Sequence, residues 1–113
     1  MADIVLINIE EGSKRVMNNT KLYAKLLIKF KDDPNMQNIE NAFNEGEKEK
    51  AQTAVHALKG LASNLSLIEL TAKAIELEAQ IKTGLLNPDM LSIVKEIYKL
   101  TIIEADKVIT KYA

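Results

Sequence analysis

Residues that break helices are rare in this chain, and their scarcity is the strongest constraint on its fold. Only four glycines and two prolines occur among 113 residues, while lysine, leucine, alanine and glutamate are abundant. These four are strong helix formers, and apolar residues recur at three- and four-residue spacing without sustained alternation. The sequence therefore predicts an all-α fold whose helices end where the few breaking residues lie.

Capping signals divide the first half of the chain. Asn8 and Glu11 form a capping box that predicts a short helix over residues 9–17. A longer helical segment over residues 20–46 follows, and Pro34 interrupts it. Proline removes a helical hydrogen bond, so either one helix kinks at Pro34 or two helices meet there.

Three more helices are predicted in the second half. The first covers residues 48–65, and the second has Ser66 as its expected N-cap and stops at Gly84. The dipeptide Asn87-Pro88 supplies the N-cap and first residue of the last helix. Short connections between long amphipathic helices favour antiparallel neighbours. We therefore expect one domain over residues 1–113, an antiparallel up-down four-helix bundle with the short extra N-terminal helix on its side or end.

Charge and composition exclude several classes of protein. Fifteen basic and 16 acidic residues give a net charge of -1, which argues against a main role in gripping nucleic acid or an anionic membrane. The absence of cysteine excludes disulfides, thiol catalysis and thiolate metal sites. No apolar run approaches the roughly 20 residues of a membrane span, and the start MADIVLINIE lacks the basic region of a signal peptide. A cytoplasmic monomer is the expectation.

The helix expected at residues 48–65 carries the only histidine of the chain. At about 100° per residue, His56 lies about 140° and Gly60 about 180° from the centre of the apolar stripe, and Lys59 about 80° from it. His56 is therefore expected to point away from the core, with Lys59 and Gly60 one turn further along. The predicted core stripe of this helix comprises Ala51, Val55, Leu58, Ala62 and Leu65.

These three residues together suggest a chemistry. A glycine inside a helix costs about 1 kcal/mol relative to alanine, so Gly60 either admits another backbone or clears space beside His56. Lys59, three residues after His56, can reach an anion attached to the ring. A neutral imidazole is a nitrogen nucleophile at pH 7, and phosphoryl transfer depends mainly on positioning and charge neutralisation. The pattern predicts a docking place for a phosphoryl group.

The sequence offers no means of using ATP by itself. It contains no Walker-type loop, no glycine-rich nucleotide loop and no obvious Mg²⁺ carboxylate cluster. The proteins that donate and accept the phosphoryl group must therefore supply the metal ion and activate the group for transfer. An exposed histidine or lysine also has an ordinary interpretation as a solvated surface residue.

The segment AVHALKG, residues 54–60, resembles the phosphorylation motif of histidine-containing phosphotransfer (HPt) domains, usually H-x-L-K-G. The likeness extends upstream, where residues 12–15 look like the G-x-x-R of the family's first helix. Residues 22–30 look like its L-Y-x-x-L-L-x-x-F segment. The sequence departs from the family at Ser66, because glycine is common ten residues after the acceptor histidine. The resemblance covers nearly the whole chain.

This resemblance implies a phosphorelay carrier, which accepts a phosphoryl group from the aspartate of one response-regulator receiver domain and passes it to another. It makes His56 the phospho-acceptor through the outer ring nitrogen, Lys59 a partner of the phosphoryl oxygens, and Gly60 the clearance for the receiver's loops. Gln52 and Ser63 lie on the same face and are expected to neighbour the phosphoryl group. Mg²⁺ belongs to the receiver, so this chain is expected to need no cofactor and to hold no metal.

Two other interpretations share parts of this pattern. The phospho-acceptor domain of a chemotaxis-type histidine kinase has the same bundle and motif, but its donor is ATP on a separate catalytic domain. The compact segment at residues 22–30 fits the relay carrier better. A non-catalytic helical adaptor is the second, and the apolar residues among 4–9 would then bind a partner instead of capping the bundle or packing on the last helix. Both a free-standing carrier and a domain of a hybrid histidine kinase fit this sequence.

A metal or haem carrier of the bundle type is disfavoured. One histidine without cysteine supplies too few ligands. Met17, Met36 and Met90 are instead expected at core or capping positions.

Overall fold

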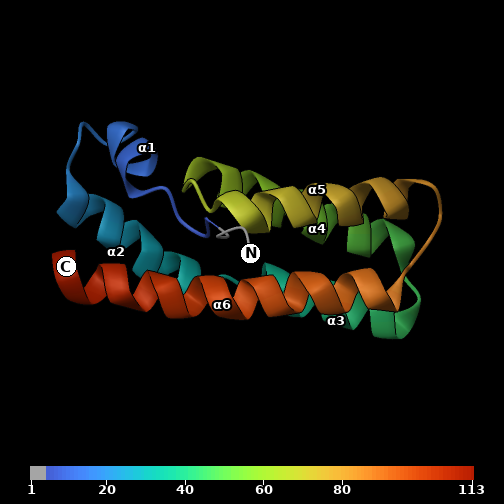
Figure 1. The fold of residues 1–113 in the computed structure, drawn as a ribbon. Coiled ribbons are helices and arrows are strands. Elements are labelled where there is room, and N and C mark those ends of the chain that lie inside the picture. The colour runs from blue at the N-terminus through green and yellow to red at the C-terminus, as the bar shows by residue number, and fades with distance from the viewer. Residues whose placement is uncertain (1–4) are drawn as a thin grey trace.

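The computed structural model describes residues 5–113, and helices dominate it (Figure 1). Within these residues there is no strand, which confirms the all-α prediction. No helix among them is apolar over a length that would cross a membrane. The helices are α1 (Ile9–Lys14), α2 (Thr20–Lys31), α3 (Asn35–Glu45), α4 (Lys48–Asn64), α5 (Ile68–Lys82) and α6 (Pro88–Tyr112).

The helices form an antiparallel up-down bundle with four arms (Figure 1). Helices α2 and α3 follow each other in one direction and form the first arm. Helix α4 runs antiparallel to them, α5 antiparallel to α4, and α6 antiparallel to α5 along the whole length of the bundle. Helix α4 packs on α3 and α5, while α6 packs on α5, α2 and α3. The predicted four-helix bundle is confirmed, with α1 as the short extra helix beside α2.

Pro34 separates two helices rather than kinking one. Helix α2 ends before it, and Pro34 itself is the N-cap of α3. The carboxylate of Asp33 accepts the backbone N–H of Asn35 at 2.9 Å, which satisfies one of the free donors at the start of α3. Gly46 ends α3 in the left-handed region at φ +69°, where glycine carries no steric penalty.

The core follows the predicted apolar positions. Every residue of the stripe predicted for α4 is buried, and so are the apolar positions of α5 that face it. The tilted rings of Phe30 in α2 and Tyr98 in α6 pack with their centroids 5.6 Å apart, which joins the first arm to the last. The largest buried apolar side chains include Tyr23, Leu27, Phe30, Ile39, Leu58, Leu67, Leu70 and Leu77.

Helix α1 ends three residues earlier than predicted. Met17 and Asn18 have φ of +58° and +60°, and the backbone N–H of Asn18 donates to the carbonyl of Ser13 at 2.8 Å. Two successive left-handed residues cannot continue a right-handed helix. Met17 therefore lies in a turn and is 92% exposed, so its predicted core or capping position is wrong. Met36 and Met90 are buried, as predicted.

The predicted N-cap of α5 is also wrong. Leu67 is the N-cap, whereas Ser66 has φ +57° and belongs to the turn that ends α4. The N–H of Leu67 donates to the carbonyl of Ala62 at 2.9 Å, and that of Ser66 to the carbonyl of Ser63 at 3.1 Å. This is the left-handed helix-ending turn in which glycine is favoured, and here serine occupies it.

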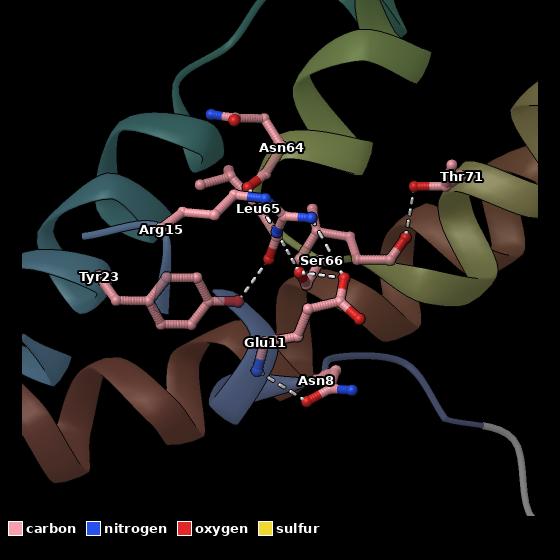
Figure 2. Close-up of polar contacts among 9 residues, drawn as sticks. Asn8, Glu11, Arg15, Tyr23, Asn64, Leu65, Ser66 and Thr71 are labelled. Carbon is pink, nitrogen blue, oxygen red and sulfur yellow. Dashed lines mark hydrogen bonds and ion pairs between the residues drawn. The ribbon is translucent and has the colours of Figure 1, made fainter. Parts of the chain in front are cut away.

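Contacts from α1 hold Ser66 in this turn (Figure 2). Its hydroxyl donates to the carboxylate of Glu11 at 2.9 Å and accepts from the guanidinium of Arg15. Arg15 also donates to the carbonyl of Asn64 at 3.1 Å. The hydrogen bonds from Ser66 and Arg15 hold the pKa of Glu11 below its ordinary value. The serine hydroxyl thus gains hydrogen bonds that a glycine in this turn lacks.

Gly12 lets α1 approach α2 closely. A Cβ on Gly12 would lie 2.4 Å from the ring of Tyr23, which is too close for any larger residue. The hydroxyl of Tyr23 donates to the carbonyl of Leu65 (Figure 2), and burial raises the pKa of Tyr23 to about 12. Gly12 therefore seats α1 against Tyr23 of α2, and Arg15 ties α1 to the end of α4.

The apolar N-terminal segment is only partly covered. Ile7 and Ile9 pack against the core, whereas Val5 is 53% exposed, and Ile4 lies outside the described residues. Two backbone hydrogen bonds tie this segment to the α4–α5 turn, from Asn8 to Ser66 and from Ile68 to Leu6, both at 3.0 Å. The segment thus caps one end of the bundle.

Candidate functional site

Helix α4 presents His56 to solvent. Its neighbours Val55 and Leu58 are fully buried, while the imidazole side chain is 69% exposed. This is the orientation that the helical periodicity predicts, because His56 lies about 140° from the core stripe. The ring is therefore accessible to another protein.

Glu78 of α5 lies directly beside the ring. Its carboxylate Oε2 is 2.9 Å from Nδ1 of His56, and its Oε1 is 2.6 Å from Nζ of Lys59. The Glu78 side chain is only 5% exposed, so these two partners satisfy a carboxylate that is almost removed from water. The three side chains form one unit that links α4 to α5.

The charge of Glu78 fixes the state of the imidazole. Burial alone would raise the pKa of this carboxyl, but hydrogen bonds from Lys59 and His56, with the nearby charges of Lys59 and Lys82, hold it below its ordinary value. Glu78 is therefore an ionised acceptor at neutral pH, and Nδ1 of His56 must carry the hydrogen. In the neutral ring Nε2 then holds the free electron pair.

Glu78 is the site residue that sequence reasoning missed. It follows Leu77 directly and lies one turn from Ala74 and Ile81, at the edge of the buried stripe of α5. A lone carboxylate at the edge of a core stripe is a usable signal, since an acidic side chain is rarely buried without a partner. The partner itself could not be named, because the register of α5 against α4 is needed to place Glu78 beside His56.

Lys59 and Gly60 differ in their surroundings. The Lys59 ammonium is directed into its ion pair with Glu78, and its side chain is 27% exposed. A Cβ on Gly60 would meet no atom of residues 5–113 within 4 Å. Among the described residues no other backbone packs on Gly60, so that interpretation of the glycine is wrong and the face of α4 at Gly60 is open.

Gln52 and Ser63, the other two predicted site residues, line two different shallow depressions. Gln52 lines one with His56, Glu78 and Lys82, together with Glu49 and Thr53. Ser63 lines the other with Lys59 and Gly60, together with Arg15, Asn64, Thr71 and Ile75. Ser63 is seven residues from His56, which is about 10 Å along the helix. The structure thus brings Gln52 to the histidine and leaves Ser63 in the neighbouring depression.

The pKa of Glu78 predicts an acid-sensitive fold. Because it is lower in the folded chain than its ordinary value of 4.5, the carboxylate stabilises the fold above that pH. This contribution is lost as the pH falls through the folded value. Urea unfolding between about pH 6 and about pH 3 should show a falling free energy of unfolding, and Glu78→Gln should flatten the curve. An unchanged slope in Glu78→Gln, with the matched variant Glu76→Gln as control, would contradict this assignment.

Comparison with known families identifies the type of domain that contains this site. The family model described as the Hpt domain matches residues 31–102, more than half of the chain. The chain belongs to the Hpt domain family. The match contains His56, Lys59 and Glu78, so the whole unit lies inside the Hpt domain. Curated proteins and solved structures give no significant match.

Family membership supports a histidine phosphotransfer role in phosphorelays, in which Hpt domains interact with receiver domains. It also agrees with the helical bundle that the structure shows. Among residues 5–113 of this Hpt domain, no group of three or more histidine, aspartate or glutamate side chains is arranged to hold a metal ion.

Proposed function

We propose that this Hpt domain carries a phosphoryl group on Nε2 of His56, between the aspartate of one receiver domain and that of another. The single observation that carries the proposal is the 2.9 Å bond between Nδ1 of His56 and the buried carboxylate of Glu78. It leaves the outer nitrogen, on a largely exposed ring, as the nucleophile.

The transfer step balances with these groups. The electron pair of Nε2 attacks the phosphorus of the receiver's aspartyl phosphate, an N–P bond forms, and the O–P bond breaks with its electron pair on the aspartate oxygen. Nδ1 keeps its hydrogen, so the ring gains a positive charge. The carboxylate of Glu78 lies against that charge and stabilises it, as an acidic partner does for an imidazolium elsewhere. The reverse sequence delivers the group to the next receiver.

The other predicted residues take supporting roles in this proposal. Lys59 holds Glu78 in its ionised form through their 2.6 Å ion pair. Gln52 is the amide best situated to hydrogen-bond the group, since it shares the depression of His56. Ser63 would contact the receiver rather than the phosphoryl group, because it lines the neighbouring depression. Mg²⁺ is supplied by the receiver in this scheme.

The test is transfer from a panel of phosphorylated receiver domains to the intact chain. We expect a product one phosphoryl group heavier by intact mass, labile in acid and stable in base. A chain that stays unmodified with every receiver, but is modified by a separate kinase domain with ATP, would instead be the acceptor domain of a chemotaxis-type kinase. Failure with both donors would overturn phosphotransfer and leave the helical adaptor as the function.

Gly60 offers a separate test of receiver docking. Gly60→Ala should raise the free energy of unfolding by about 1 kcal/mol, because alanine favours the helix and its Cβ meets open space. The same change should slow transfer from the receiver, and Gly60→Leu should slow it further, because the side chain occupies the clearance beside His56. Chemical unfolding and transfer rates measure the two effects. Transfer at the unmodified rate in both variants would show that the receiver does not approach over Gly60.

A further inference from the structure

The charges at His56 balance before any phosphoryl group arrives. Lys59 and the ring of His56 both bond Glu78, so the ammonium and the carboxylate cancel each other. A phosphoryl group adds up to about two negative charges on strong acceptor oxygens. Glu49 also lines the depression of His56, which adds a further negative charge there. The ring gains one positive charge on phosphorylation and so offsets only part of this charge, which leaves a role for a further cation of the chain.

Lys82 of α5 is placed to be that cation. It lines the same depression as His56 and Gln52, one helical turn beyond Glu78. Its charge already acts on this site, since it contributes to lowering the pKa of Glu78. Among residues 5–113, the ion pairs within 4.0 Å engage Lys59 but not Lys82. Its ammonium is therefore available to a new anion.

We propose that Lys82 supplies the positive charge that binds the phosphoryl group on His56, while Lys59 is held by Glu78 and positions the ring. The inference rests on the proposed function, because it needs a phosphoryl group on His56. It divides between two lysines the work that the motif alone assigns to Lys59. Lysine acts on phosphate as a flexible point charge, so Lys82 can follow the group without a fixed geometry.

A small phosphoramidate donor tests this without a receiver in the reaction. The variants are Lys82→Ala, Lys82→Arg and the matched control Lys25→Ala, which removes the same charge from an exposed position on α2. We expect Lys82→Ala to slow phosphorylation of His56 about five- to tenfold, with Lys82→Arg restoring most of the rate and Lys25→Ala unchanged. Rates are followed by intact mass, and the ³¹P chemical shift of the phosphohistidine should move in Lys82→Ala.

The outcomes separate the inference from the function on which it rests. Lys82→Ala that takes up phosphate as fast as Lys25→Ala, with the same ³¹P shift, overturns the role of Lys82 and leaves the acceptor intact. A slowed Lys82→Ala that Lys82→Arg does not restore also overturns it, because charge is then not the property that matters. An unsubstituted chain that no donor phosphorylates overturns the proposed function itself. Unfolding by urea should be unchanged in Lys82→Ala, which excludes a merely structural effect.

Discussion

Substituting His56 by glutamine is expected to abolish phosphoryl uptake from every donor. Glutamine retains a polar side chain of similar reach but has no nitrogen with a free electron pair, so no N–P bond can form. The loss should be complete within detection, because His56 is the only histidine of the chain and it has no cysteine. Intact mass after incubation with a phosphorylated receiver measures the effect.

The fold should survive this substitution. The imidazole side chain is 69% exposed and contributes no core contact of α4, so its removal leaves the buried stripe unchanged. Far-ultraviolet circular dichroism and urea unfolding should match the unsubstituted chain within about 1 kcal/mol. A base-stable, acid-labile adduct that persists in folded His56→Gln would place the acceptor elsewhere and refute the assignment.

Binding to the receiver should remain when transfer is lost. Glutamine at position 56 leaves the open face at Gly60 and the two depressions largely as they are. A phosphorelay carrier therefore predicts that His56→Gln forms a complex that transfers nothing. An adaptor predicts no functional difference between the two chains, which separates the classes in one experiment.

Much of the fold could be predicted because its signals are local. The N-caps Asn8 and Asn87, the interruption at Pro34 and the apolar stripe of α4 each depend on residues within a few positions of one another. The error at Ser66 has a different origin. Ser66 carries a good capping side chain, but contacts from α1 draw its hydroxyl away and the turn takes a left-handed residue there. Such contacts join positions about fifty residues apart and leave no local pattern.

The candidate site divides in the same way. The outward direction of His56 and the spacing of Lys59 and Gly60 follow from one helix, so the sequence alone places them. Glu78 lies 22 residues from His56 on an antiparallel neighbour, and its meeting with the ring depends on how α5 is set against α4. That register arises from packing over the whole bundle. The motif therefore indicates the proposed nucleophile, His56, but not the carboxylate of Glu78 beside it.

Removing Glu78 should slow transfer about 10- to 100-fold without abolishing it, the range seen when a metal-binding histidine loses the carboxylate that orients its ring. In Glu78→Ala the ring is free to exchange its hydrogen between the two nitrogens and to rotate, so Nε2 is available for only part of the time. Glu78→Gln keeps an acceptor for Nδ1 but loses the charge that stabilises the phosphorylated ring, and it leaves Lys59 without its ion pair. Both variants should therefore transfer the phosphoryl group more slowly than the unsubstituted chain.

The two causes can be separated by the imidazole itself. Nitrogen chemical shifts of His56 report which ring nitrogen carries the hydrogen. We expect the Nδ1–H tautomer in the unsubstituted chain and a mixture of the two tautomers in Glu78→Ala. In Glu78→Gln the fraction of the Nδ1–H tautomer should lie between these two. The matched control is Glu76→Gln, an exposed residue of α5 whose ion pair with Lys73 measures 3.6 Å. If Glu78→Ala transfers as fast as Glu76→Gln while its tautomers mix, orientation is irrelevant to the rate. If Glu78→Ala transfers slowly and its tautomer is unchanged, the carboxylate acts through its charge alone. What the variant has then lost is the electrostatic stabilisation of the imidazolium that forms during transfer.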